Sequence, residues 1–417
     1  MRPVPKVERV VPNALGAPAA RTSALRTTRF TWLVLCLFLS GCAIIPFREP
    51  PRPGRTTLTS PLVILPAQNI GNYLLLEAKW DRFGPYHFLI DTGSSVTLVT
   101  PALAQRYPSR SLPPPGTPRV RVKSAEGNIT ELPATWLRKL DLGDAHFEDV
   151  PALIYDCSAI SAHLGVRIDG VLGFPLFREA LLTLDYPAER VVLQPARTTA
   201  PTPGTTIAFD DARKTPVIHV GLGNRSLVAL IDSGFDGSFS LNPVGVEPKF
   251  AFGPRPGAVV GTLDGDRVQE IGRLAEPLAI GGYVMPQPIV DLTDELSAVG
   301  SEVLKNFTVT FDQEHDRVTF YRESRDPIVT GPRLSAGVSF SKTPAYWRVA
   351  GVVPDSPAAH ADIHPGDLVT RINGEPVAKW DLRRYEQLVA GAGEITFVFL
   401  NGNSESAKKV GVFALVP

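Results

Sequence analysis

An internal repeat constrains this chain more than any other feature. Two apolar, strand-like runs end in the same way: Leu89-Ile90-Asp91-Thr92-Gly93 and Leu230-Ile231-Asp232-Ser233-Gly234. Each copy also contains a Gly, an Asp twelve residues later and an Arg-Val pair five residues after that Asp. These residues are Gly173, Asp185 and Arg190 in the first copy and Gly300, Asp312 and Arg317 in the second. Because the landmarks keep their order, we expect two lobes that fold alike. We name residues 61–200 the first repeat and residues 201–328 the second repeat.

Both repeats have the sequence signals of β-structure. Short apolar or alternating runs, such as Tyr73–Leu76 and Thr308–Phe311, are separated by clusters of Gly, Pro, Asn and Asp. Within the repeats we predict a helical turn only at Pro101–Tyr107. A chain of 417 residues is too long for one core. We therefore expect a mainly β protein of two tandem β-barrel lobes with a smaller C-terminal domain.

Asp91 and Asp232 are the candidate catalytic residues. Each follows an apolar strand, and Gly93 and Gly234, which lack a Cβ, allow two such loops to approach closely. If the lobes face each other about a pseudo-twofold axis, the two carboxyl groups meet and share one proton. The ionised group can then activate a water, while the neutral group hydrogen-bonds a substrate carbonyl. Either Asp can have either role, because the pair titrates as a unit.

The segment Phe88–Ser95 resembles the active-site loop of aspartic peptidases, both pepsin-like and retropepsin-like, and Ile231–Gly234 resembles its second copy. Gly170–Gly173 is similar to the segment that this family threads behind the loop, as is, more weakly, Ser297–Gly300. The resemblance implies two acid-protease-type lobes and an aspartic-type endopeptidase that acts on a peptide or protein substrate. It implies no cofactor and no metal.

The same resemblance implies roles for residues around the pair. Thr92 and Ser233 would hydrogen-bond across to the opposite loop and lock the pair. Two segments that contain acidic-Gly pairs stand where the family has its flap hairpins. The supporting loop residues are Thr92, Gly93, Ser94, Ser233 and Gly234. The flap candidates are Glu126, Gly127, Asp264 and Gly265.

Residues 331–417 have a different pattern. Ser-Pro-Ala-Ala, Pro-Gly-Asp and Ile-Asn-Gly-Glu-Pro-Val follow one another and resemble a bacterial PDZ domain, a small α/β-barrel. A capped helix start is expected at Asp355–Ala359 and a second helix at Leu382–Val389. PDZ domains bind extended peptides, so the resemblance implies binding of peptide termini or segments, with Gly337 and Val338 as candidate residues. The alternative is a domain that only packs on the lobes.

The N-terminal residues have the pattern of a targeting signal. Basic residues precede the apolar run Phe30–Leu39, which is too short to span a bilayer well, and small residues follow it. Leu39-Ser40-Gly41-Cys42 resembles the lipobox of bacterial lipoproteins. That resemblance implies a signal peptide of residues 1–41, cleavage before Cys42 and a lipid on its thiol. A plain signal peptide or a short anchor helix is the alternative.

A lipid on Cys42 would be the protein's only membrane contact, followed by a proline-rich tether of residues 42–60. In bacterial lipoproteins an Asp after the lipidated Cys retains the protein at the inner membrane, so the resemblance, with Ala43 in that place, implies no such retention. We therefore expect a location in the cell envelope, facing the periplasm and anchored to the outer membrane. Cys157 is then left without a partner thiol, and we expect it in the core.

Composition argues against several other classes. The 42 basic and 42 acidic residues balance to a net charge of zero, so nucleic acid is not an expected partner. Three cysteines provide no disulfide framework, and the chain contains no serine-protease or His-Glu-x-x-His motif. Because the repeat is fused in one chain, the site needs no second copy, and a monomer is expected.

Phe235 supports a competing hypothesis. It follows the second Gly of the repeat, where aspartic peptidases usually have Ser, Thr or Ala, and its ring could crowd the two Asp residues. The first flap segment also lacks the tyrosine of pepsin-like enzymes. The alternative function is therefore a catalytically weak lipoprotein that holds peptides in its cleft or PDZ groove. Retention of both Asp loops argues against it.

Overall fold

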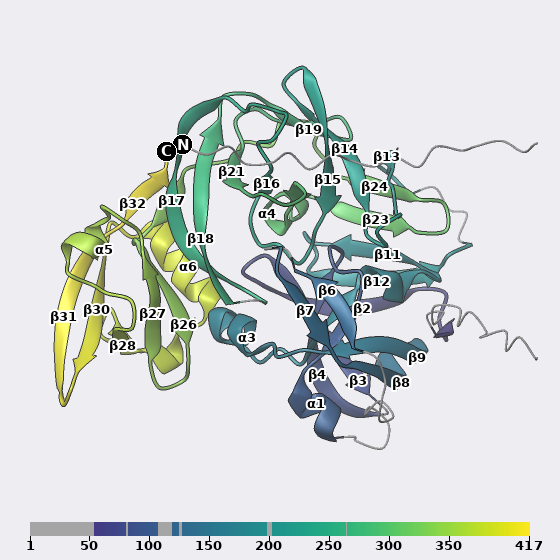
Figure 1. Ribbon diagram of the computed structural model, residues 1–417, viewed down its shortest axis with the longest axis horizontal. Coiled ribbons are helices and arrows are strands. Elements are labelled where there is room, and N and C mark those ends of the chain that lie inside the picture. Colours follow the sequence, from purple (N-terminus) through teal and green to yellow (C-terminus); the bar gives the residue numbers. More distant parts are fainter. Residues whose placement is uncertain (1–53, 81, 107–118, 125–126, 198–201, 264) are drawn as a thin grey trace, which may run out of the picture. The chain divides into compact units, whose positions relative to one another are not determined.

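The computed structural model describes residues 54–417 except 81, 107–118, 125–126, 198–201 and 264 (Figure 1). The described chain is mainly β, with curved sheets in both repeats and a smaller domain in the C-terminal segment that resembles a PDZ domain, as predicted. The signal peptide, Cys42, Glu126 and Asp264 lie outside the described residues. Thr56–Leu58, which we predicted as part of the tether, form a strand instead, because they pair with a strand of the first repeat.

The strands of the first repeat, with the short strand before it, are β1 (Thr56–Leu58), β2 (Val63–Ile70), β3 (Tyr73–Trp80), β4 (Phe83–Asp91), β5 (Thr97–Val99), β6 (Val120–Lys123), β7 (Ile129–Leu132), β8 (Ala134–Leu142), β9 (Ala145–Ile154), β10 (Gly170–Gly173), β11 (Ala180–Asp185) and β12 (Arg190–Pro195). The strands of the second repeat are β13 (Thr205–Ala208), β14 (Val217–Leu222), β15 (Arg225–Ile231), β16 (Phe239–Leu241), β17 (Phe250–Thr262), β18 (Gly265–Leu274), β19 (Leu278–Ile280), β20 (Tyr283–Met285), β21 (Ile289–Leu292), β22 (Ala298–Val299), β23 (Thr308–Asp312) and β24 (Arg317–Tyr321).

The two Asp loops occupy equivalent places in two sheets. Neighbouring strands follow the order β9-β5-β10-β4-β3 in the first repeat and β21-β16-β22-β15-β14 in the second. In each repeat a short strand runs parallel to the strand that leads to the Asp and antiparallel to the strand after the loop. The glycine-containing segments that resembled the threaded segment are these inserted strands, β10 and β22. Asp91 and Asp232 therefore lie at the same point of two matching sheets.

The Asp and Arg landmarks of the repeat belong to two hairpins that join the repeats. Asp185 faces Arg190 across β11–β12, and Asp312 faces Arg317 across β23–β24. Strands β11 and β23 pair antiparallel with each other, so one sheet runs through both repeats. Thr183 and Thr310, which have equivalent places in the repeat, are register partners, and their hydroxyl oxygens lie 2.9 Å apart. This sheet fixes the two repeats relative to each other.

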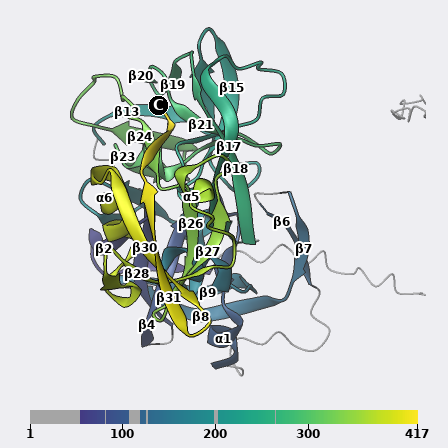
Figure 2. The ribbon, with the colours of Figure 1, turned by 90° about the vertical axis from the view of Figure 1, so that its left-hand side faces the viewer.

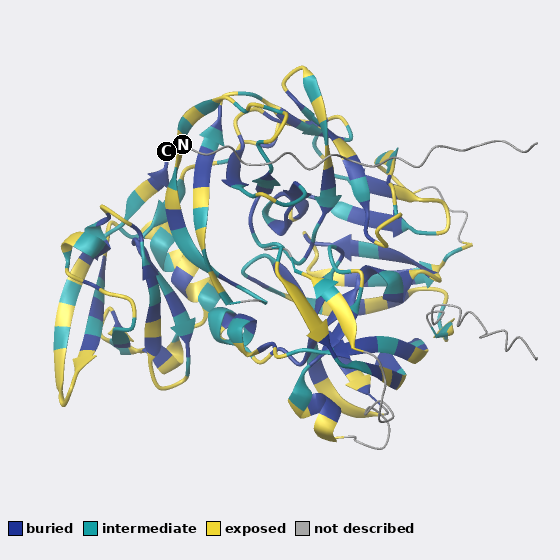
Figure 3. Cartoon of the chain, viewed as in Figure 1, coloured by how far each residue is buried: buried dark blue, intermediate teal, exposed yellow. Residues whose placement is uncertain are grey.

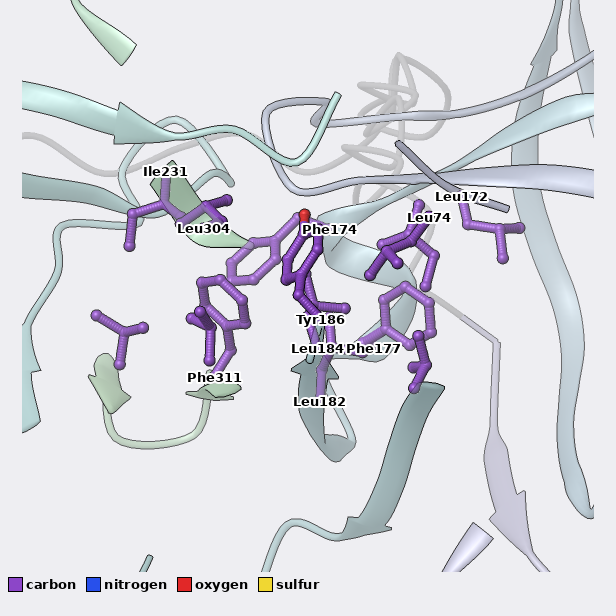
Figure 4. Packing of buried hydrophobic residues seen from close by; sticks show 14 of the residues in the cluster. Leu74, Leu172, Phe174, Phe177, Leu182, Leu184, Tyr186, Ile231, Leu304 and Phe311 are labelled. Atoms are coloured by element: carbon purple, nitrogen blue, oxygen red, sulfur yellow. The ribbon is translucent and has the colours of Figure 1, made fainter. Parts of the chain in front are cut away.

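One hydrophobic core extends through both repeats (Figure 4). Phe174 from the first repeat meets Phe311 from the second edge to face, with ring centroids 5.3 Å apart. Buried positions recur along the strands that meet there (Figure 3). Each large apolar side chain buried in this way contributes about 1.5–3 kcal/mol. The shared core therefore opposes separation of the two repeats.

The helices of the repeats are short: α1 (Pro101–Arg106), α3 (Ser158–Leu164), η1 (Phe174–Phe177) and α4 (Ser301–Leu304). The helical turn predicted at Pro101–Tyr107 is confirmed as α1, with Tyr107 outside the described residues. The prediction of no further helix was wrong, most notably for α3. That helix is too short to show a clear period in the sequence, but it buries Ile160 and Leu164 and ends at Gly165, whose φ is +76°.

The PDZ domain comprises β25 (Arg333–Ser335), β26 (Val338–Lys342), β27 (Trp347–Val352), α5 (Pro357–His360), β28 (Leu368–Ile372), β29 (Glu375–Pro376), η2 (Val377–Lys379), α6 (Leu382–Gly391), β30 (Glu394–Asn401), β31 (Ser404–Gly411) and β32 (Phe413–Val416) (Figure 2). Both predicted helices are present. Ser356 Oγ accepts a hydrogen bond from Ala359 N at the start of α5, and Asp381 caps α6.

Cys157 is fully buried, as expected, and burial raises the pKa of its thiol to about 12, so it is a core residue rather than a nucleophile. In the described part of the chain, none of the helices has the length and apolar character needed to cross a bilayer.

Candidate active site

Both Asp loops line one cavity of about 470 Å³. Its walls also include Tyr73, Phe235 and residues from the hairpins β6–β7 and β17–β18. A second cavity, of about 610 Å³, is lined by arginines of the first repeat and shares no lining residue with the first. The cavity that contains the two Asp residues, which we name the cleft, is therefore the candidate active site.

Thr92 and Ser233 interlock the two loops. Thr92 Oγ1 donates to Ile231 O at 2.7 Å and accepts from Ser233 N at 3.0 Å. Ser233 Oγ in turn donates to Ile90 O at 2.9 Å and accepts from Thr92 N at 3.0 Å. Both side chains are fully buried. The four bonds repeat the same pattern in both directions, so the loops are held about a local twofold axis.

Gly93 and Gly234 leave the space that the opposite carboxyl group fills. A Cβ at Gly93 would lie 2.5 Å from Asp232 Cγ, and a Cβ at Gly234 would lie 2.4 Å from Asp91 Cγ. Neither separation is possible for non-bonded carbon atoms, so each loop requires glycine for this close approach. The two carboxyl groups also share a hydrogen bond.

Burial raises the pKa of Asp91 above its usual value of 3.8. Hydrogen bonds from the Asp232 side chain and from the backbone N–H groups of Gly93 and Ser94 oppose this shift without cancelling it. Asp91 Oδ1 is buried without a hydrogen-bond partner within the described residues, whereas Asp232 Oδ1 accepts from Gly234 N at 2.8 Å. One oxygen of the pair is thus oriented by a backbone N–H group, whereas Asp91 Oδ1 has no such partner among the described residues.

The Phe235 ring lies against two glycines near the second loop. A Cβ at Gly237 would be 2.4 Å from Phe235 Cζ, and one at Gly300 would be 2.5 Å from Phe235 Cδ1. The ring therefore packs on two glycines, while Phe235 still lines the cleft. The feature that motivated the competing hypothesis is thus accommodated locally.

The residues that support the second loop could not be identified from the sequence. Tyr186 from the first repeat hydrogen-bonds to Ser301 Oγ at 2.9 Å, and Ser301 Oγ donates to Ser233 O at 3.1 Å. Tyr73 and Asp236 also line the cleft, and burial raises the pKa of Asp236 to about 6. These residues come from four separate segments, so no local motif could have indicated them.

Both segments predicted as flaps are hairpins that line the cleft. Gly127 lies in the turn between β6 and β7, and Lys123 of that hairpin forms an ion pair with Glu295 of the second repeat at 2.6 Å. Gly265 begins β18 in the hairpin β17–β18, with φ at +121°. Neither Glu126 nor Asp264 belongs to the described residues.

The two candidate PDZ residues are both engaged within their own domain. Gly337 N donates to Ser335 Oγ at 2.8 Å, and Gly337 O accepts from Val353 N at 2.9 Å. Val338 is buried in the PDZ core. In this conformation the Gly337 N–H is therefore not free to receive a peptide carboxylate.

The interlock of the loops leads to a stability prediction. Thr92→Val and Ser233→Ala should each lower the free energy of unfolding by about 1–3 kcal/mol, because each leaves a buried donor and acceptor unpaired. Chemical denaturation of the single and double variants measures this, with the exposed Thr130→Val as the matched control. A double variant whose loss equals the sum of the single losses would show that the two side chains do not act together.

Comparison with known families agrees with this geometry. Residues 79–176 match the family model described as aspartyl protease, and residues 348–399 match that of the PDZ domain. The chain thus carries an aspartyl protease family domain and a PDZ domain, which support a peptidase-type hydrolase with peptide binding. No curated protein matches the chain. The first match contains Asp91 but not Asp232, so it covers one of the two Asp loops.

Proposed function

We propose that this protein is an aspartic-type endopeptidase with two pepsin-like lobes, whose catalytic pair is Asp91 and Asp232. The observation that carries the proposal is the interlocked meeting of two equivalent Asp loops inside one cleft. A structural turn would not require glycine at both points where a Cβ would meet the opposite carboxyl group. The aspartyl protease match in the first repeat supports the same reaction class.

The proposed reaction uses one shared proton. The ionised carboxylate of the pair accepts a proton from a water, and that water attacks the carbonyl carbon of the scissile amide. The protonated carboxyl group hydrogen-bonds the carbonyl oxygen and then donates its proton as the tetrahedral intermediate forms. Backbone N–H groups of Gly93, Ser94 and Gly234 stabilise the charged form of the pair. The carboxyl group that took the water's proton then donates it to the amide nitrogen, while the other carboxylate takes a proton from a hydroxyl of the intermediate. The C–N bond breaks, an amine and a carboxylic acid are released, and the pair again shares one proton.

The cleft fits an extended peptide. Hairpins β6–β7 and β17–β18 both contribute to its walls, and more of the exposed lining is apolar than polar. Leu89, Leu98, Val171 and Leu230 are among the apolar residues of this lining. We expect substrates with apolar side chains on the two sides of the cleaved bond.

The pH dependence tests this proposal. Because burial raises the pKa of Asp91, the pair keeps its shared proton above the usual Asp range, so activity should extend into weakly acidic solution. As the pH rises through the raised pKa the proton is lost and activity should fall. At low pH the second carboxylate is protonated and activity should fall again. The measurement is kcat/KM for a peptide from about pH 3 to pH 8. A rate that keeps rising to the alkaline end would contradict a shared proton.

Several further predictions stay untested. The alternative, a catalytically weak protein that holds peptides in its cleft or PDZ groove, would show saturable peptide binding without cleavage at any pH. The lipid at Cys42, the periplasm-facing location at the outer membrane and the monomeric state also remain predictions.

A further inference from the structure

We propose that Ser339 and Gly351 of the PDZ domain are positioning residues for the cleft, because they hold the hairpin β17–β18, which we name the second flap. The kinetic part of this inference rests on the proposed peptidase function. The contact itself does not, since it is a property of the fold. The PDZ domain would then be part of the peptidase rather than an appended binding module.

The contact between the PDZ domain and the second flap is direct. Val259 N, in β17, donates a hydrogen bond of 3.1 Å to Ser339 Oγ, in β26. The Val259 side chain lies against Gly351 of β27, so closely that a Cβ on Gly351 would be 2.1 Å from Val259 Cγ2. Strands β17, β26 and β27 lie side by side (Figures 1 and 2). The flap strand is thus both hydrogen-bonded to the PDZ sheet and packed into a space that only glycine leaves.

The tip of the same flap is held by the first repeat. Gly261 N donates to Nδ1 of His163, in α3, at 3.2 Å. Burial, and then the charge of Lys342, lower the pKa of His163 to about 4, so Nδ1 remains an acceptor at neutral pH. The Lys342 ammonium group in turn donates to His163 O. On the other side of the tip, the Tyr155 hydroxyl donates to Leu263 O at 2.9 Å.

These attachments act on residues that form the cleft. Val260, Gly261, Thr262 and Leu263 all line the cavity that contains Asp91 and Asp232. Val259, the residue held by the PDZ domain, directly precedes them in the chain. A shift of Val259 would therefore move the wall of the cleft. Strand β26 lies at the edge of its sheet, and PDZ domains bind peptides along such an edge, so Ser339 links this edge strand to the flap.

Hydrogen exchange of the full-length chain tests the contact without relying on activity. In Ser339→Ala the Val259 amide loses its acceptor, so exchange in residues 255–263 should rise by about 2- to 10-fold. Gly351→Ala should have at least this effect, because its new Cβ displaces Val259. Ser339→Thr keeps the hydroxyl and should restore protection. Ser341→Ala, two residues along the same strand, is the matched control.

Peptide cleavage by the same variants tests the consequence for the cleft. Ser339→Ala should raise KM by about 2- to 10-fold while kcat stays within about twofold, because the flap binds the substrate and does not perform the chemistry. Flap exchange and KM at wild-type values in both Ser339→Ala and Gly351→Ala would overturn the inference. If no variant, including the wild type, cleaves peptides, the proposed function fails, and the exchange data alone decide whether the PDZ domain holds the flap.

Discussion

Asp91→Asn and Asp232→Asn should each reduce kcat for peptide cleavage by about 10²–10⁴-fold or more. An Asn can neither accept the proton of the attacking water nor donate one to the substrate carbonyl. Because the pair acts as a unit, the double variant should lose little more activity than either single variant. Steady-state kinetics with a cleaved peptide gives the result, and Asp316→Asn, an exposed turn residue outside the cleft, is the control.

The fold should survive these substitutions. The pKa of Asp91 is raised by burial, so its ionised form destabilises the native state once the pH exceeds that pKa. Asn carries no charge, and the melting temperature of Asp91→Asn near neutral pH should equal or exceed that of the wild type. Peptide binding should also persist. Cleavage at the wild-type rate in either Asn variant would remove that residue from the proposed pair.

Gly93→Ala and Gly234→Ala should be almost as damaging to activity, for a steric reason. Each new Cβ would lie 2.4–2.5 Å from the carboxyl carbon of the opposite Asp, so the loops must separate. Displacements of about 1 Å at a catalytic group can lower the rate by about 10²-fold. The overpacked loops should also cost about 1–3 kcal/mol of stability.

Gly391→Ala, where nothing lies within 4 Å of the new Cβ, is the matched control for these two glycine variants. It should leave both activity and stability near their wild-type values. If Gly93→Ala and Gly234→Ala also retain full activity, the carboxyl groups are not as closely paired as the structure indicates.

The repeat allowed much of the fold to be predicted, because its landmarks are local. An apolar strand that ends in Asp-Thr-Gly specifies its own turn, and the Asp and Arg landmarks face each other across a single hairpin. The PDZ domain could be predicted for the same reason, because its signals are also local: Ser356 caps a helix that starts at the next residue. Two copies of one pattern also implied that Asp91 and Asp232 meet.

Features that depend on distant residues could not be predicted. Tyr186 and Ser301 support the second loop across 115 residues of sequence, and Val259 reaches Ser339 across 80. Neither pair has a spacing that a helix or hairpin would impose. The sequence likewise left open whether Phe235 crowds the pair, because Gly237 and Gly300, on which its ring lies, could not be recognised as its neighbours.

The central claim is tested most directly by digesting a peptide library in oxygen-18-labelled water with the full-length chain, beside Asp91→Asn and Asp232→Asn. Mass spectrometry then identifies each new carboxyl terminus. Our account predicts cleavage at weakly acidic pH, preferentially between apolar residues, one labelled oxygen in each new carboxyl group, and product formation reduced by about 10²-fold or more in either variant. The absence of cleavage by the wild type at every pH, or the same products at the wild-type rate from either Asn variant, would contradict it.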